Sequence, residues 1–207
     1  MKRLLRRFFR YAVFILYVYL YEKPRGLDFH MRDQSFSKAT QGKYSGYAVT
    51  PISHVKKFIS CLNISKENSF LDVGCGKGLV LSIVEKFSYN KIQGIDIVEE
   101  LVEIAKRNMT ILGIQNRVQV LAEDATKFQD YGSFDHIFFS NPFPPAIMKP
   151  VLEKIIESLN DSPREVMLIY YNPHLNHQVI METGRFQVVQ ELFDPIKGYK
   201  THIYRSC

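Results

Sequence analysis

The sequence predicts a single α/β domain with a mostly parallel sheet of seven strands, helices on both faces of the sheet, and an antiparallel hairpin at the C-terminal end. Two observations lead to this fold. From residue 69 onward, short apolar runs alternate with amphipathic stretches, the pattern of parallel strands joined by crossover helices. A glycine-rich turn directly follows the first of these runs. A chain of 207 residues is long enough to bury one sizeable core.

The expected elements follow one another along the chain. A first helix is expected over residues 50–62, with Thr50 as its N-cap and Pro51 at its first helical position. The seven strands are expected at residues 69–73, 91–97, 117–122, 134–140, 165–171, 186–193 and 200–204, with further helices at residues 78–87, 99–112, 146–159 and 175–182. The last two strands flank Asp194, Pro195 and Gly198, residues typical of turns, and this predicts the closing hairpin.

The stretch 99–112 shows why a helix is predicted between strands. Its apolar residues fall on one face of a helix, namely Leu101, Ile104, Ala105 and Leu112. Gly113 is the expected C-terminal stop, and Glu103 is expected to pair with Arg107 one turn further on.

Residues 1–46 form an N-terminal part that precedes the domain expected over residues 47–207. Five basic residues and no acidic ones occupy the first ten positions, and an uncharged run of 11 residues follows from Tyr11 to Tyr21. Such a run is too short to cross a bilayer, which takes roughly 17–25 apolar residues. It predicts a basic amphipathic helix over residues 1–21 that either lies on an anionic membrane surface or packs on the domain. The polar stretch 22–46 predicts a lid or linker.

The net charge of +6 is concentrated at the N-terminus. Beyond the first ten residues, 22 Lys and Arg stand against 21 Asp and Glu, so the domain is nearly neutral. A surface that follows nucleic-acid phosphates needs a broad spread of basic residues, and we therefore expect no nucleic-acid partner. Cys61, Cys75 and Cys207 form no C-x-x-C pair, and no residue cluster has the spacing of metal ligands. The sequence thus predicts a cytoplasmic protein without a metal, with peripheral membrane contact left open.

The turn after the first strand is the most informative motif of the chain. Residues 70–78 read Phe-Leu-Asp-Val-Gly-Cys-Gly-Lys-Gly. Gly74, Gly76 and Gly78 let the backbone turn sharply and approach a ligand closely, and the turn opens a helix whose free N–H groups favour an anionic group. Asp72, near the strand end, is expected to take an amino group of the ligand, directly or through water. The motif predicts a pocket for a nucleoside with a charged tail.

The spacing of the glycines separates this motif from the dinucleotide-binding fingerprint, which reads G-x-G-x-x-G. Asp-x-Gly-x-Gly-x-Gly after a strand resembles the first motif of the class I, seven-strand, Rossmann-like S-adenosylmethionine-dependent methyltransferases. The resemblance covers roughly residues 50–207. It implies a methyltransferase with S-adenosylmethionine as its cofactor, bound by Asp72, Gly74, Gly76 and Gly78.

Two further acids stand at the ends of the next strands, on the edge where open α/β sheets bind ligands. Asp96 follows Gly94 and Ile95 and is placed to accept hydrogen bonds from both ribose hydroxyls; it also matches the family's ribose-binding acid, and N-capping of the following helix is the alternative role. The resemblance implies that Asp124 faces the exocyclic amine of adenine. A solvated loop acid is the alternative for Asp124.

Candidate catalytic residues stand at the ends of the fourth and fifth strands. Amino-methylating members of the family often carry Asn-Pro-Pro-aromatic after the fourth strand, and this chain has Asn141-Pro142-Phe143 instead. The resemblance implies that Asn141 holds a target amine, while specificity for adenine or glutamine does not carry over. Tyr171 and His174 end the fifth strand, and His174 is a candidate general base. A surface loop position is the alternative for His174.

The acceptor is left open by the sequence. Direct SN2 transfer to an amine, such as a protein lysine, is the first expectation, and a lipid or small metabolite at a membrane surface is the second. Two rivals lie outside this reaction class: a non-catalytic cofactor-binding module, and a nicotinamide oxidoreductase, which the glycine spacing disfavours.

Overall fold

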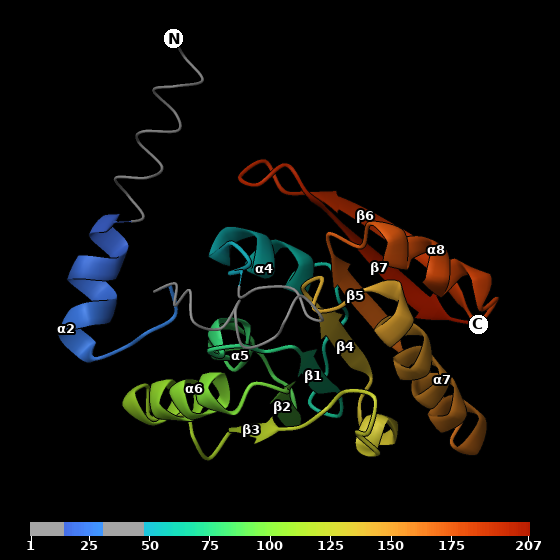
Figure 1. The fold of residues 1–207 in the computed structure, drawn as a ribbon, viewed down its shortest axis with the longest axis horizontal. Coiled ribbons are helices and arrows are strands. Elements are labelled where there is room, and N and C mark those ends of the chain that lie inside the picture. Colours follow the sequence, from blue (N-terminus) through green and yellow to red (C-terminus); the bar gives the residue numbers. More distant parts are fainter. Residues whose placement is uncertain (1–14, 31–47) are drawn as a thin grey trace, which may run out of the picture.

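The computed structural model describes residues 15–30 and 48–207 of the chain (Figure 1). Its sheet has seven strands in the order β3-β2-β1-β4-β5-β7-β6. Strands β1 to β5 are parallel, and β7 is antiparallel to both β5 and β6. The strands are β1 (Ser69–Val73), β2 (Lys91–Asp96), β3 (Val118–Ala122), β4 (His136–Phe139), β5 (Met167–Tyr171), β6 (Phe186–Phe193) and β7 (Lys200–Ser206). The predicted fold class is confirmed.

Helices cover both faces of this sheet. On one face lie α4 (Ile52–Ile59), α5 (Leu79–Val84) and α6 (Glu99–Ile111), and on the other lie η2 (Asp130–Ser133), α7 (Pro145–Asp161) and α8 (Leu175–Glu182) (Figure 1). Side chains of a strand alternate between the two faces. Phe70 of β1 therefore belongs to the core under α4 to α6, and its neighbours Leu71 and Val73 belong to the core under α7 and α8. This central position keeps the carboxyl end of β1 rigid.

Three local predictions were wrong. Thr50 does not cap the first helix, because its Oγ1 lies 2.9 Å from Oγ of Ser140 and the extended Pro51 is the residue before α4. The helix is shorter than residues 50–62, since it runs only from Ile52 to Ile59. In α6, Glu103 pairs with Lys106 at 2.8 Å, three residues on, in place of Arg107. Gly113 does follow the end of α6, at φ +71°.

The described N-terminal residues are helical from 15 to 25, with a π-helical turn, η1 (Val18–Glu22), followed by α2 (Lys23–Arg25). Pro24 has no N–H to donate and conflicts with the carbonyl four residues earlier, and the helix is widened over the turn that precedes it. Gly26 ends the helix at φ +72°.

Residues 27–30 then pack on the domain, where Leu27 and Phe29 are buried in the core beside α5 and α6. Residues 22–30 thus differ from the linker predicted there. The basic cluster of residues 2–10 and the rest of the predicted lid lie outside the described residues. Within residues 15–30 and 48–207, no helix has the length and apolar character needed to cross a membrane.

Candidate active site

A cleft opens at the carboxyl ends of β1 to β4 and encloses about 1050 Å³, its open mouth included. This is the edge of the sheet where parallel strands and their following loops present ligand-binding groups. The three acids predicted from the sequence, Asp72, Asp96 and Asp124, all line the cleft. Small, apolar and hydroxyl residues complete its wall: Gly74 and Gly76 from the glycine turn, Val49 and Thr50 from the segment before α4, and Ser140, Pro142 and Phe143 from the end of β4.

The glycine turn between β1 and α5 is fixed by hydrogen bonds to β2. The N–H groups of Gly74 and Cys75 donate to the carbonyl of Ile95, at 2.8 and 3.0 Å. Gly74 and Gly76 have φ values of +78° and +53°, a region in which residues with a Cβ are strained. A Cβ on Gly74 would also lie 2.7 Å from Cβ of Pro142. The loop therefore needs glycine at position 74 both for its backbone and for the space.

Gly78 stands at the end of the glycine turn, where α5 begins. It lies outside the residues that line the cleft, and a Cβ there would lie 2.9 Å from Cε of Met109 and 3.3 Å from Cβ of Ala105. The absence of a side chain lets the start of α5 pack closely against α6. Gly78, at φ +81°, thus stabilises the loop through the packing of α5 on α6.

Asp72 is a buried acid of the cleft whose ionisation is strongly perturbed. Its side chain is 2% exposed, and its Oδ2 has no hydrogen-bond partner among the described residues. Burial, with a smaller contribution from the charge of Asp96, raises the pKa of Asp72 well above its usual value. A buried carboxylate oxygen that faces a cavity without a partner is suited to a cationic donor from a ligand.

Asp96 accepts two backbone hydrogen bonds that shape the cleft. Its Oδ2 accepts from the N–H of Gly76 at 2.8 Å, and its Oδ1 accepts from the N–H of Val98 at 2.9 Å. Burial raises the pKa of Asp96, and these backbone donors partly offset that effect. Asp96 is not the N-cap of α6, because that position is Val98, two residues later, and no side chain caps the helix. Each oxygen keeps a further lone pair for a ligand hydroxyl.

Asp124 stands at the end of β3 and is held by its own loop. Its Oδ1 accepts from the N–H and from Oγ1 of Thr126, at 2.9 and 2.8 Å. The neighbouring Glu123 donates its N–H to the carbonyl of Asp96 at 2.9 Å, which joins the ends of β2 and β3. Asp124 and Glu123 both line the cleft.

Asn141 comes directly after Ser140, beyond the end of β4, and is not itself among the residues that line the cleft. Its neighbours Ser140 and Pro142 both line the cleft, and its own backbone has φ +46°. Non-glycine residues in this region are strained, and such strain is concentrated at functional sites. Asn172 and His174, after β5, have the same property, with φ values of +58° and +42°.

Tyr171 and His174, the other two candidate catalytic residues, do not line the cleft either. The hydroxyl of Tyr171 donates to Oδ2 of the buried Asp194 at 2.6 Å, and burial together with this carboxylate raises the pKa of Tyr171 far above its usual value. His174 is exposed just before α8 and does not line the cleft.

Sequence reasoning missed the pair formed by Thr50 and Ser140, which lies in the cleft wall. The two residues are 90 positions apart, and no local pattern signals the contact. Among the described residues, no group of three or more His, Cys, Asp or Glu side chains is placed to hold a metal ion.

Residues 64–197, more than half of the chain, match a family model described as a methyltransferase domain. The chain belongs to this methyltransferase family. With the predicted fold and glycine turn in place, the methyltransferase is an enzyme that uses S-adenosylmethionine. The resemblance to the class I family is thereby confirmed.

Relatives of known name are also methyltransferases. The methyltransferase is 29% identical over 140 residues to the ribosomal protein L11 methyltransferase of Thermotoga maritima, a match that covers 67% of this chain and 49% of the relative. It is 28% identical over 135 residues to a protein-L-isoaspartate O-methyltransferase of Helicobacter pylori, covering 65% of this chain and 59% of the relative. The chain spans about half the length of the first of these relatives.

Solved structures share the fold of the methyltransferase at low sequence identity. The ribosomal protein L11 methylase of Lactobacillus delbrueckii superposes with a TM-score of 0.61 and 15% identity, over 77% of this chain and 80% of that one. An RNA methyltransferase of Salinibacter ruber, in complex with S-adenosyl-L-homocysteine, superposes with a TM-score of 0.58 and 14% identity, over 77% of this chain and 94% of that one. At such identities the likeness concerns the fold alone.

Proposed function

We propose that this methyltransferase transfers the methyl group to an amine nitrogen, and that a protein lysine is the first acceptor to test. The observation that carries the proposal is the chemistry of the cleft wall at the end of β4. Thr50 and Ser140 bring neutral hydroxyl groups there, Asn141 follows directly, and the three acids stand at the ends of β1 to β3. A wall of neutral acceptors suits a neutral amine better than an anionic nucleophile.

The acids define the cofactor side in this proposal. The partnerless Oδ2 of Asp72 fits the ammonium group of the methionine part, Asp96 fits the ribose hydroxyls, and Asp124 fits the adenine amine. When bound, S-adenosylmethionine supplies an electrophilic methyl group, which the lone pair of the acceptor takes by direct SN2 attack while the electron pair of the broken bond stays on sulfur.

The residues of the chain then have three tasks. The glycine turn and Asp72 orient the cofactor, and Phe143 and Val49 help to exclude water from the cleft. Asn141, which stands between the cleft-lining Ser140 and Pro142, accepts a hydrogen bond from the amine. A lysine side chain is mostly protonated at neutral pH, because its ordinary pKa is about 10.4, and it must lose a proton before attack. Since the described residues that line the β4 side carry no carboxylate, this proton passes to water.

The name of the Thermotoga maritima relative, a ribosomal protein L11 methyltransferase, supports a protein as the acceptor. The name of the Helicobacter pylori relative points to a different linkage, an ester on an isoaspartate. The two linkages differ chemically, because a methyl ester releases methanol in alkali and an N-methyl group does not.

The test is transfer of tritiated methyl groups from S-adenosylmethionine to a cell lysate that is separated into protein, lipid and small-molecule pools. The proposal predicts label in the protein pool that survives alkali and appears as methyl-lysine after hydrolysis. Label that leaves the protein as methanol, or that enters only another pool, would refute the lysine acceptor. An Asp72→Asn variant, with weakened cofactor binding, serves as the control and should transfer less label at the same concentration of S-adenosylmethionine.

A lipid or small metabolite at a membrane surface is the second candidate acceptor. One observation favours it: large apolar residues of the N-terminal helical segment are exposed, with Leu16 at 54% and Leu20 at 68%. The lipid pool of the same assay decides between the two acceptors.

A further inference from the structure

We propose that the helical segment of residues 15–25 is a docking surface for an anionic lipid bilayer. Three large residues on its outer side are exposed: Leu16 at 54%, Tyr19 at 56% and Leu20 at 68%. They are spaced by three and four positions, so they lie on one face of the helix. In Figure 1 this helix (blue) stands at one margin of the molecule. Adjacent exposed apolar residues of this kind mark interaction sites.

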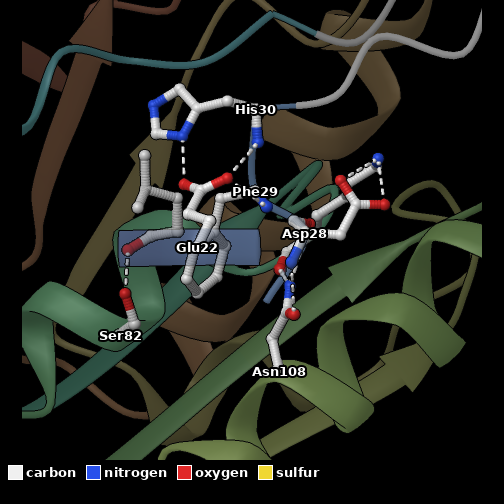
Figure 2. A network of polar contacts seen from close by, with 8 residues as sticks. Glu22, Asp28, Phe29, His30, Ser82 and Asn108 are labelled. Carbon is white, nitrogen blue, oxygen red and sulfur yellow. Dashed lines mark hydrogen bonds and ion pairs between the residues drawn. The ribbon is translucent and has the colours of Figure 1, made fainter. Parts of the chain in front are cut away.

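The opposite side of the same segment is fastened to the protein. Val18 is 5% exposed and Glu22 is fully buried. The carboxylate of Glu22 accepts hydrogen bonds from the N–H groups of Phe29 and His30, at 3.4 and 3.3 Å, and contacts the ring of His30 (Figure 2). These contacts orient the helix, and Leu16, Tyr19 and Leu20 are turned outward as a consequence.

The segment after the helix is anchored to the cofactor side of the domain. Asp28 donates its N–H to Oδ1 of Asn108 in α6, and Nδ2 of Asn108 donates back to the carbonyl of Asp28, both at 3.0 Å (Figure 2). The same Nδ2 donates to the carbonyl of Lys77 in the glycine turn at 3.0 Å. A bilayer bound to the helix is therefore connected to the glycine turn through a few packed residues.

The charges around the apolar face select an anionic surface. Nζ of Lys23 lies 4.4 Å from the centre of the Tyr19 ring, and Cζ of Arg25 lies 4.3 Å from that of Tyr21. The first ten residues of the sequence add five positive charges, whereas the rest of the chain is nearly neutral. Tyrosines with adjacent cations and leucines suit the headgroup region, where rings meet both apolar and polar surroundings.

Other partners fit these features less well. A nucleic acid would use the cations but leave Leu16 and Leu20 in water. No helix of the described residues is long and apolar enough to span a membrane, which agrees with a helix that lies on the surface. The docking proposal does not depend on which acceptor the enzyme methylates.

The test is co-sedimentation of the 207-residue chain with vesicles of phosphatidylcholine alone or of phosphatidylcholine and phosphatidylglycerol. We expect binding to the anionic vesicles that weakens as salt is raised, because headgroup attraction is screened. The double variant Leu16→Ser, Leu20→Ser should bind at least about tenfold more weakly, because two leucine side chains no longer enter the apolar boundary. Leu175→Ser is the matched control, because Leu175 on α8 is 69% exposed and Leu20 is 68% exposed. This variant should bind the vesicles as the natural chain does.

Thermal unfolding of each variant checks that the folded domain is retained, which we expect because the replaced residues are exposed. Three results would overturn the proposal. The chain could fail to bind anionic vesicles better than neutral ones, or the double variant could bind like the Leu175→Ser control. Sedimentation could also show a dimer that the double variant abolishes, which would make the apolar face an interface between copies of this chain.

Discussion

Nζ of Lys77, inside the glycine turn, lies 2.8 Å from both carboxylate oxygens of Asp28, 49 positions earlier in the chain. The Lys77 side chain is 2% exposed and that of Asp28 is 23% exposed. A largely buried ion pair of this kind is costly to break from one side, because the remaining charge stays in a poorly solvated place. The N-terminal segment is thereby part of the support of the glycine turn.

Replacing Asp28 by asparagine should lower the free energy of unfolding by about 1–3 kcal/mol, because the buried Lys77 ammonium loses the charge of the Asp28 carboxylate. Denaturant unfolding measures this change. The matched control is Asp130→Asn, which breaks the exposed pair with Lys91 (2.7 Å) and should cost less than about 1 kcal/mol. Equal losses in the two variants would show that the buried pair has no special structural role.

Replacing Gly74 by alanine should weaken S-adenosylmethionine binding by about tenfold or more. The new Cβ would meet Pro142 at 2.7 Å at a backbone φ of +78°, so the loop must move out of its position in the cleft. Gly184→Ala is the control, since Gly184 has φ +65° and nothing within 4 Å of the added Cβ. The control should lose about 1 kcal/mol of stability to backbone strain and keep its affinity. Unchanged affinity in Gly74→Ala would contradict the role given to the loop.

Replacing Asp72 by asparagine should stabilise the free protein and abolish most of its response to cofactor. One oxygen of the buried Asp72 carboxylate has no hydrogen-bond partner among the described residues. Because an uncharged amide loses less solvation energy on burial, we expect the free energy of unfolding to rise by about 1 kcal/mol at neutral pH. Loss of a charge-assisted contact should weaken cofactor binding by about 10- to 100-fold. Thermal unfolding with and without S-adenosylmethionine measures both effects, and a variant that is less stable yet equally responsive would count against this assignment.

The stability of the protein should fall in mild acid because of His136. Burial lowers the pKa of His136 from 6.5 to about 4, with a smaller opposing effect of Asp135. Between pH 6.5 and about pH 4, His136 is protonated in the unfolded chain but not in the folded protein. The stability that the neutral side chain gives above pH 6.5 is therefore lost as the pH falls toward 4. The loss due to this residue is about 3 kcal/mol. In His136→Gln the curve of unfolding free energy against pH should be flatter by that amount, and curves of the same slope would disprove the effect.

Local patterns were sufficient to predict the sheet and to place Asp72, Asp96 and Asp124 together at the cleft. Parallel strands buried on both faces give apolar runs, and the glycine turn, Asp96 and Asp124 follow directly on the ends of their strands. Position at a strand end is enough to place such residues on one edge of the sheet.

The remaining features depend on contacts that are distant in sequence. Thr50 pairs with Ser140, Asp28 with Lys77 and Tyr171 with Asp194, and none of these pairs is part of a local motif. Tyr171 was a reasonable candidate because it ends a strand on the ligand edge. Its side chain instead packs beside His54 of α4, with the ring centres 5.3 Å apart, and does not line the cleft.

The most direct test of the central claim is calorimetric titration of the chain with S-adenosylmethionine in buffers of different ionisation enthalpy, over a range of pH. Because the pKa of Asp72 is raised in the free protein, a cation bound beside it should favour the carboxylate. The account predicts binding that releases protons and tightens as the pH rises toward that raised pKa, with the proton release lost in Asp72→Asn. The absence of binding of both S-adenosylmethionine and S-adenosylhomocysteine at millimolar concentration, or binding with the same proton exchange in Asp72→Asn, would contradict it.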